Sequence, residues 1–572
     1  MAEVLLSPGV LANENDSSFL QAQPVQAGAA ILGPTVKGPV GIPTVVTTYS
    51  EYQNKFGAVV ESGSAQYTYF TSIAAYNYFQ QGGDSLLVTR IVSGSYTPAT
   101  SSRVANNDAS ILSSFVLETL SEGTDQNSTS TLGSAGQLPS GSSENIRWEI
   151  VSPNTSSGTF SLLIRRGDDI TTSKTILETW ANLSLDPNAS NYIEKVIGNS
   201  TQTVTEDSGT GEYYVANAGT YNTISNFVRV KSVAAKTLNY FDNAGNAKSE
   251  FTASIPTAQS GTFGDADGTA FETITGTFYE NIATDTQGLV AGNYTISLNL
   301  LANQDDYKYN LIVAPGLTKQ SHSAPLTTMV DTSQQRGDNL SVIDLRNYGS
   351  EINSVVNDAS SVDSSYAATY WPWVQTIDPD LGSQVWVPAS TMMPGVFAFN
   401  DTAGEAWFAP AGLSRGSMNT VLRAERKLTN GNRDTLYQAN VNPIATFPNA
   451  GVVVFGQKTL QTAASALDRV NVRRLLIALK NYISQIADNL VFEQNTIATR
   501  NNFLTQVNPY LASVQQRQGL YAFKVVMDDS NNTPDVIDRN QLIGQIYIQP
   551  TKTAEFIYLD FNILPTGATF PA

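Results

Sequence analysis

Two kinds of hydrophobic pattern divide the chain. Towards both ends, continuous apolar runs such as YNLIVAPG and LSVIDLRN stand beside segments with helical spacing, whereas the middle carries short runs that alternate apolar and polar residues. Continuous apolar runs are typical of strands buried on both faces of a parallel sheet. Alternating runs are typical of strands with one buried face. The pattern therefore predicts an α/β fold interrupted by a β-rich segment.

The α/β pattern begins after residue 22. A β-branched strand at Thr44–Thr48 lies among glycines and prolines, and the spacing in YTYFTSIAAYNYFQQGG predicts a helix that ends at the two glycines. The run SLLVTRIV then predicts a strand. The same pattern of continuous apolar runs returns near residue 305, in YNLIVAPG, LSVIDLRN, AATYWPWVQ and EAWFAPAG. We expect these runs to be further strands of the same sheet.

The middle of the chain, residues 99–304, is rich in Ser, Thr, Asn and Gly. Its alternating runs IRWEIV, TFSLLIRR and YTISLNLL predict strands and an all-β insertion. Residues 101–290 hold 10 Lys and Arg against 21 Asp and Glu, a net charge of −11. We expect such an acidic segment to face solvent and to repel nucleic acid and anionic membranes.

The longest helical pattern is DRVNVRRLLIALKNYISQIADNLVFEQN, residues 468–495. Its leucines and isoleucines form one apolar stripe, and Arg469, Arg473 and Lys480 fall together away from that stripe. Alone, this basic face could be an ordinary solvated surface or a contact for an acidic partner. A second helical stretch and the strands YAFKVVMD and IGQIYIQP follow it.

The last strand-like run is AEFIYLDFNI, residues 554–563. Ile557, Leu559, Phe561 and Ile563 lie on one side of it, as period-two alternation requires. A strand this close to the end of the sequence raises the question of what it pairs with.

Composition argues against enzyme chemistry. The chain has 572 residues, a net charge of −18, no cysteine and a single histidine, His322, which we expect in a surface loop. Thiolate nucleophiles and sites with two histidines are therefore excluded. There is no phosphate-binding GxxxxGK[ST] motif, so we expect no catalytic residues, no cofactor and no metal. The start MAEVLLSPGV predicts no signal peptide, and no apolar run is long enough for a membrane span.

Several collinear motifs carry a family resemblance. SPGVLANENDSS, GPVGIPTVVTTYSEYQNKFG and AAYNYFQQGGDSLLVTRIV resemble the opening of contractile phage tail sheath proteins. ERKLTNGNRDTLYQANVNPIATFPNAGVVVFGQKTL, VNVRRLLIALKNYI and NNTPDVIDRNQLIGQIYIQPTKTAEFIYLDFNI resemble their second half. The resemblance covers residues 5–98 and about 305–564 but not the insertion.

Together, pattern and resemblance predict a multidomain fold of the α/β and α+β classes. We expect an α/β core interrupted by an all-β insertion, a C-terminal α+β domain and extended terminal arms. The predicted parts are an N-terminal arm (1–22), the core (23–98 plus 305–425), the acidic outer insertion (99–304), an inner domain facing the tail tube (426–550), and a C-terminal strand and arm (551–572).

The resemblance implies a structural subunit that is not an enzyme. Sheath subunits stack as six-membered rings around a tail tube and contract to drive the tube through the host envelope. The implied partners are other copies of the chain, the tail tube protein, and the baseplate and tail terminator proteins, without nucleic acid or membrane insertion. The implied location is the virion tail, assembled in the host cytoplasm. The alternatives are the sheath of a non-phage contractile injection system and, from another class, a surface-layer or adhesion protein.

The resemblance also gives roles to both ends and to the basic helix. In sheaths, terminal strands complete sheets on neighbouring subunits by strand addition. The implied strand-exchange residues are Val4, Leu5, Leu6, Ile557, Leu559, Phe561 and Ile563. We favour residues 2–10 as the donated strand and 544–563 as the acceptor sheet. The implied tube-facing residues are Arg469, Arg473 and Lys480.

Overall fold

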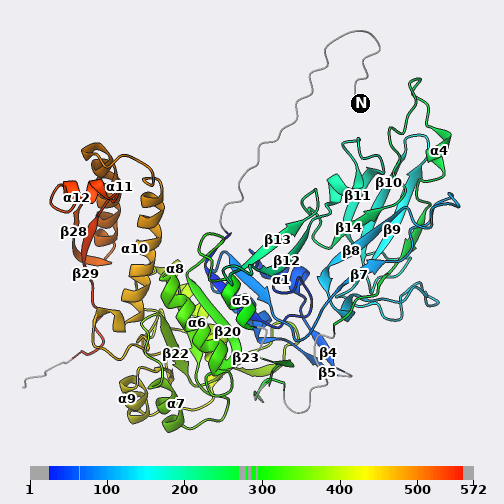
Figure 1. Ribbon diagram of the computed structural model, residues 1–572. Coiled ribbons are helices and arrows are strands. Elements are labelled where there is room, and N and C mark those ends of the chain that lie inside the picture. The colour runs from blue at the N-terminus through cyan, green and yellow to red at the C-terminus, as the bar shows by residue number, and fades with distance from the viewer. Residues whose placement is uncertain are drawn as a thin grey trace, which may run out of the picture.

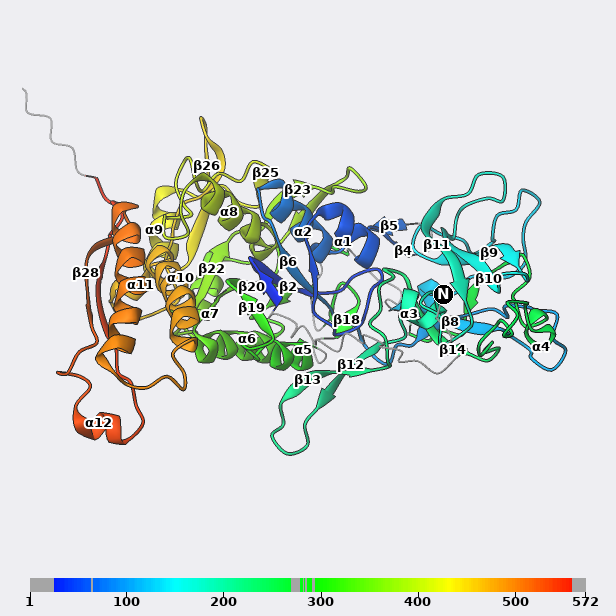
Figure 2. The same cartoon turned by 90° about the horizontal axis from the view of Figure 1, so that it is seen from above.

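Three parts of the chain lie in a row in the computed structural model, which describes residues 25–62, 65–268, 278–280, 282, 285–290 and 294–557 (Figures 1 and 2). A mixed α/β core occupies the middle. A β-rich part stands at one end of it, and a helical part with a hairpin stands at the other. At this level, the predicted mixed fold with several sheets is confirmed.

Eight strands of the described residues form the central sheet, in the order β27-β26-β22-β21-β20-β2-β6-β3. Neighbours from β26 to β6 run parallel, and β27 and β3 pair antiparallel at the two edges. Five inner strands are buried along their whole length, as the continuous apolar runs predict. The strands are β2 (Ala29–Gly33), β3 (Thr44–Val46), β6 (Leu86–Arg90), β20 (Leu311–Thr318), β21 (Leu340–Asp344), β22 (Ala367–Trp371), β26 (Asn442–Phe447) and β27 (Gly451–Val454).

Helices cover both faces of the central sheet because successive strand residues point to opposite sides. Ile31 of β2 joins the apolar cluster under α2 (Phe70–Gln80) and α8 (Ala389–Ala403), whereas Leu32 joins the cluster on the other face. The helix predicted before Gly82–Gly83 is α2 and is confirmed. The helices on the second face are α5 (Tyr294–Leu300), α6 (Ser323–Arg336), α7 (Ile352–Ala359) and α9 (Asn430–Gln438).

Segments on both sides of the insertion build this one sheet. Strand β2 lies between β6 and β20, and β1 (Val25–Ala27) pairs in parallel with β19 (Tyr307–Tyr309). Strands β26 and β27 belong to the same sheet although they follow residue 425, so the core extends past the boundary predicted there. Smaller elements border the core: α1 (Tyr49–Phe56), β4 (Val60–Ser62), β5 (Ala65–Tyr67), β17 (Asp285–Thr286), β18 (Leu289–Val290), β23 (Val374–Ile377), β24 (Gln384–Val387) and β25 (Val421–Ala424).

Two predicted strands are wrong. YTISLNLL forms helix α5, because Tyr294, Leu298 and Leu301 lie at helical spacing and pack into the core cluster that also contains α6. EAWFAPAG, residues 405–412, forms turns rather than a strand, and its Trp407 packs into the C-terminal part. In both segments the apolar residues are buried against helices and not within the sheet.

Two four-stranded sheets form the insertion, in the orders β11-β10-β9-β15 and β14-β8-β7-β16. Their inward residues, among them Trp148, Ile150, Leu162 and Ile164, share one apolar cluster. A hairpin of β12 (Thr201–Glu206) and β13 (Tyr213–Ala218) and the short helices α3 (Ile193–Ile197) and α4 (Ser249–Thr252) complete it. The sheet strands are β7 (Pro98–Ser101), β8 (Phe115–Glu122), β9 (Ile146–Asn154), β10 (Thr159–Arg166), β11 (Ile176–Ser184), β14 (Val228–Val233), β15 (Gln259–Gly261) and β16 (Phe263–Gly264).

The insertion leaves and re-enters the core at one place. The Thr97 N–H donates to the Asp267 carbonyl at 3.0 Å, and the Asp267 N–H donates to Thr97 Oγ1 at 2.7 Å. Lys37 of the core pairs with Glu144 of the insertion at 2.9 Å. The insertion is therefore a side branch whose two ends meet, and the core sheet does not depend on its strands for continuity.

The C-terminal part packs two long helices against a hairpin. Helices α10 (Val470–Asp488) and α11 (Ile497–Gln516) bury their apolar side chains with β28 (Leu520–Val526) and β29 (Gln545–Pro550), which pair antiparallel. The short helix α12 (Pro534–Asp538) lies between the two strands in sequence. The predicted stripe on α10 is confirmed, since Leu475, Leu479 and Ile486 are buried in this cluster.

Residues 551–557 follow β29 without regular secondary structure, so the strand predicted over 554–563 does not begin within them. No strand in the described part of the chain pairs with these residues. An extended segment becomes a strand only beside a hydrogen-bonding partner, and the described part of the chain supplies none here. Residues 558–563 lie outside the described residues.

Candidate assembly surfaces

Helix α10 joins the core to the C-terminal part. Val470 and Ile477 lie in the apolar cluster of the core, whereas Leu475, Leu479 and Ile486 lie in the cluster of the C-terminal part. A helix with apolar residues on more than one face is buried between partners. The first half of α10 is therefore an integral part of the molecule and presents only some of its side chains to solvent.

Two arginines of α10 tie this helix to the core. Arg473 is 4% exposed, its guanidinium lies 3.8 Å from the centre of the Tyr366 ring, and its Nε donates to the Ser365 carbonyl at 3.2 Å. Burial lowers the pKa of Arg473, and the neighbouring Tyr366 counteracts this. Arg474 donates to Asp401 at 2.8 Å and stacks on Phe397 at 4.7 Å. Removing Arg473 would leave the half-buried Tyr366 ring without its cation, and removing Arg474 would do the same to the buried Phe397 ring.

The three basic residues predicted to face the tube thus have different surroundings. Lys480 is exposed, and its Nζ lies 3.1 Å from the Tyr366 hydroxyl. Lys480 and Arg473 are brought together on the same tyrosine. Arg469 lies just before the first turn of α10 and contacts a different group, Glu555. Of the three, Lys480 is the residue that leaves most of its charge accessible to a partner.

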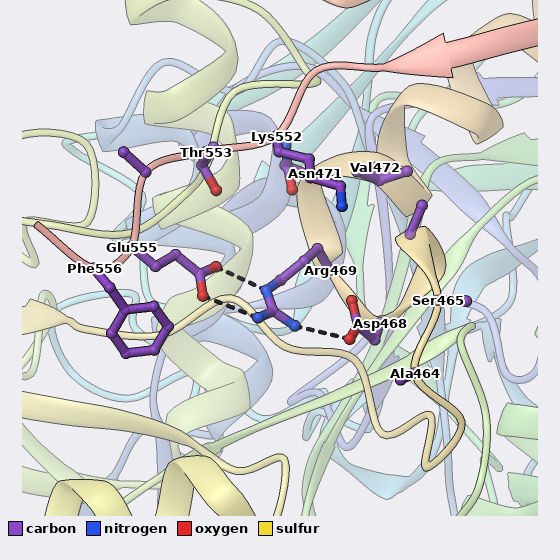
Figure 3. Close-up of a pocket in the computed structure, with 12 residues that line it drawn as sticks. Ala464, Ser465, Asp468, Arg469, Asn471, Val472, Lys552, Thr553, Glu555 and Phe556 are labelled. Carbon is purple, nitrogen blue, oxygen red and sulfur yellow. Dashed lines mark hydrogen bonds and ion pairs between the residues drawn. The ribbon is translucent and has the colours of Figure 1, made fainter.

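The contact between Arg469 and Glu555 holds the C-terminal segment on the core (Figure 3). Arg469 Nε donates to Glu555 Oε1 at 2.8 Å and Nη2 donates to Oε2 at 3.0 Å, while Nη1 pairs with Asp468 at 3.0 Å. Burial disfavours the charged carboxylate, but hydrogen bonds from Arg469, Tyr437 and Gln457 outweigh burial and lower the pKa of Glu555. A cavity of about 590 Å³ lies beside this contact, between residues 464–472 and 552–556.

The hairpin of β28 and β29 is a two-stranded sheet with open edges. Within the described residues neither strand pairs with a third strand. Helix α11 packs against the hairpin, and the exposed side chains of Tyr521 and Tyr547 project from it. Open edges present unpaired backbone groups and are sites for strand addition.

The predicted strand-exchange residues fall almost entirely outside the described residues. Val4, Leu5 and Leu6 lie there, as do Leu559, Phe561 and Ile563. Ile557 is described, and its side chain is 76% exposed. The roles of both ends of the chain therefore stay predictions.

Trp407 and Glu555 are structurally important residues that sequence reasoning missed. Trp407 lies in the C-terminal cluster, donates from Nε1 to the Arg517 carbonyl at 3.1 Å and stacks under the Arg517 guanidinium at 5.0 Å. The sequence feature that could have identified Trp407 is its position between Gly404 and Pro410. This run has too many turn-forming residues to be a central strand. For Glu555, the sequence offered no sign of its partners.

The prediction for His322 is wrong. Its side chain is 2% exposed, and Nδ1 accepts a hydrogen bond from the Thr318 N–H at 3.2 Å. His322 stands at the start of α6, and its side chain is buried although Gln320, Ser323 and Ala324 beside it are exposed. No group of three His, Cys, Asp or Glu side chains in the described ranges could hold a metal ion.

Two family models match the chain in sequence order. The phage tail sheath protein central domain matches residues 290–460, and the phage tail sheath C-terminal domain matches residues 462–564. The first range contains α5 to β27 and most of the central sheet, and the second contains α10, α11 and the hairpin. Residues 290–564 of the chain belong to the phage tail sheath protein family.

Curated sheath proteins resemble the chain over part of its length. The tail sheath protein of Vibrio phage KVP40 is 38% identical over 38% of this chain and 32% of its own length. Those of Enterobacteria phage T4 and Salmonella phage ViI are 34% and 30% identical, over 43% and 50% of this chain and 37% and 49% of their own lengths. The chain thus spans about a third to a half of the length of these sheath relatives.

The boundary between the two sheath domain models falls just before α10. The first ends at residue 460 and the second begins at 462, which places Arg469 and α10 in the sheath C-terminal domain and β26 and β27 in the central domain. Among the described residues, no helix is long and apolar enough to cross a membrane.

Proposed function

We propose that the chain is a structural, non-enzymatic subunit of a contractile tail sheath in the virion tail, assembled in the host cytoplasm. Six copies form a ring, and rings stack around a tail tube in a metastable extended state. Contraction widens the rings and drives the tube through the host envelope. The observation that carries this proposal is the collinear match of both sheath domains to residues 290–460 and 462–564.

Strand exchange between subunits links the rings in this proposal. The hairpin of β28 and β29 has open edges, so its backbone N–H and C=O groups can pair with a strand from a neighbour. We assign the donated strand to residues 2–10, with Val4, Leu5 and Leu6 at its centre, and the acceptor sheet to residues 544–563. Each hydrogen bond nets only about 0.5–1.5 kcal/mol, so many repeated pairings are needed for a durable lattice.

The helix α10 is the proposed surface for the tail tube. Lys480 carries the accessible positive charge of this surface, while Arg469 and Arg473 hold the helix and its neighbours in place. Exposed ion pairs contribute about 0.2–1 kcal/mol each. Contacts of this strength align the sheath subunits on the tube and still break when the sheath contracts. The acidic insertion then lies on the outside, and baseplate and terminator proteins cap the stack.

Negative-stain electron microscopy of the chain expressed alone tests the proposal. We expect hollow, striated tubes from the full chain and loss of these tubes from a chain lacking residues 1–12. Tubes from both chains would leave the sheath function intact but move the link away from the N-terminus. A stable monomer from the full chain, even when tube and baseplate proteins are supplied, would contradict the proposed function.

A further inference from the structure

The segment after the hairpin has one strongly bonded residue in otherwise exposed surroundings. Lys552, Thr553, Ala554 and Phe556 are exposed, and the segment has no regular secondary structure. Glu555 is the exception, with a side chain that is 18% exposed. A single partly buried carboxylate in an exposed segment is a candidate anchor, because it concentrates the segment's contacts at one point.

Four donors from three separate places in the core converge on the Glu555 carboxylate. Arg469 donates twice, at 2.8 and 3.0 Å, the Tyr437 hydroxyl donates at 2.7 Å, and Gln457 Nε2 donates at 3.0 Å. Gln457 Nε2 also donates to Thr553 Oγ1 at 2.6 Å. Bidentate and charge-assisted hydrogen bonds are the strongest kind that side chains make, and their geometry is directional.

The groups that bind this carboxylate come from the core and not from the C-terminal segment. Tyr437 lies on α9, Gln457 follows β27, and Arg469 precedes α10. The Tyr437 ring also lies 4.5 Å from Lys458 Nζ and 6.0 Å from the Arg469 guanidinium, so two cations stand beside it. Among the described residues, Asp468, at 3.0 Å from Arg469, is the other acid that pairs with these positive groups. Displacing the carboxylate therefore leaves two partly buried cations that share one acidic partner.

We propose that Glu555 anchors the C-terminal segment to the core and fixes the point at which the following chain leaves the subunit. This inference rests on the proposed sheath function for its consequence: the anchor sets the origin of the C-terminal arm that reaches a neighbour. Arg469, Tyr437 and Gln457 are then positioning residues for the arm. The segment up to Glu555 then keeps its place on the core when subunits rearrange.

A spin label near the anchor tests the inference on the full, unassembled chain. Because the chain has no cysteine, an Ala554→Cys substitution gives a single labelling position on an exposed residue. We expect Glu555→Gln and Arg469→Gln each to raise the mobile fraction of the label about tenfold or more. Each substitution removes a hydrogen bond between charged groups, and the loss of such a bond is large enough to shift the equilibrium between bound and free segment by this factor. The double variant should be no more mobile than Glu555→Gln alone, because the contact that Arg469→Gln removes is already broken there.

Glu493→Gln is the matched control, since Glu493 is an exposed acid on the loop after α10. It should leave the label spectrum unchanged, and all variants should keep the thermal unfolding midpoint of the core. The proposed anchor would be contradicted if the mobile fraction of the label were unchanged in both Glu555→Gln and Arg469→Gln. It would also be contradicted if the two substitutions raised the mobile fraction additively in the double variant.

Tube formation by the same variants tests the positioning role. Glu555→Gln should lower the number of tubes seen by electron microscopy, whereas Glu493→Gln should not. Normal tube numbers despite a mobile label would overturn the claim that the anchor positions the arm. If the unsubstituted chain formed no tubes, the proposed function would fail, while the label would still decide whether the anchor exists.

Discussion

At the scale of single residues, cations stacked on aromatic rings secure the joint between the core and the C-terminal part. Arg473 lies 3.8 Å from the Tyr366 ring, Arg474 lies 4.7 Å from Phe397, and Arg517 lies 5.0 Å from Trp407. Each such contact contributes about 0.5–2 kcal/mol, with the larger values for desolvated pairs. The joint therefore depends on a few buried side chains, and single substitutions there should be costly.

Replacing Trp407 should destabilise the C-terminal part. Trp407 is 6% exposed and fills the cluster of α10, α11 and the hairpin, so Trp407→Ala leaves a cavity. We expect the free energy of unfolding to fall by about 3–5 kcal/mol, measured by urea denaturation followed by circular dichroism. Trp180→Ala in the insertion is the control, since Trp180 is only partly buried. A loss for Trp407→Ala no larger than for the control would contradict this role.

Asp344 should make stability depend on pH. Burial raises its pKa to about 7 from 3.8, and hydrogen bonds from Ser390 only partly offset the burial. Because the folded pKa is the higher one, the folded state binds this proton more tightly than the unfolded state. The resulting stabilisation is complete below about pH 4 and is lost as pH rises through 7, on the order of a few kcal/mol.

Asp344→Asn should remove this dependence. Unfolding free energies measured between pH 4 and 8 should fall with pH for the unsubstituted chain more steeply than for Asp344→Asn. Parallel curves for the two chains would show that Asp344 does not titrate across this range.

At the scale of elements, α10 combines a structural and an interactive role. Its apolar residues lie in two clusters, and its basic residues divide between buried contacts and solvent. The hairpin of β28 and β29 contributes the open edges of the C-terminal part. A helix fixed in this way can present Lys480 in a defined place relative to those edges.

Charge reversal on α10 should separate these roles. Lys480→Glu should leave the thermal midpoint unchanged and reduce sheath assembly on co-expressed tube, with a smaller difference at high salt. Arg473→Glu should instead destabilise the chain by about 3–5 kcal/mol, because it buries an unpaired acid against Tyr366. Lys248→Glu in the insertion is the control for Lys480→Glu. Normal tube decoration by Lys480→Glu would contradict a tube contact at this residue.

At the scale of the whole molecule, the insertion is a branch and the core is continuous without it. The hydrogen bonds between Thr97 and Asp267 bring its two ends together, and the central sheet is formed by strands on either side. The insertion also carries much of the negative charge of the chain. Its removal should therefore change the outer surface of an assembly more than the lattice that holds it together.

Replacing residues 98–266 with a short Gly-Ser linker should leave the core folded. Closing so short a loop costs little entropy because Thr97 and Asp267 already lie in contact. We expect tubes of the shortened chain by electron microscopy and a loss of a few degrees in thermal midpoint, since the Lys37–Glu144 pair disappears. Aggregation of the shortened chain would show that the insertion is part of the core.

The core sheet could be predicted from the sequence because burial on both faces leaves continuous apolar runs, as in β20 and β21. YTISLNLL and EAWFAPAG were wrongly predicted to be strands. Their apolar residues pack on helices, and short apolar runs do not distinguish a helix from a strand. The basic residues of α10 could be placed on one helix, but their partners Tyr366 and Glu555 are distant in sequence. Only the fold shows that Arg473 is buried and Lys480 is exposed.

The most direct measurement is a cryo-electron microscopy reconstruction of tubes assembled from the full chain. We predict six-membered rings with α10 lining the inner channel, the insertion on the outer surface, and the hairpin of β28 and β29 extended by strands from neighbouring subunits. A tube in which the hairpin stays two-stranded, or in which the insertion faces the channel, would contradict the proposed sheath organisation.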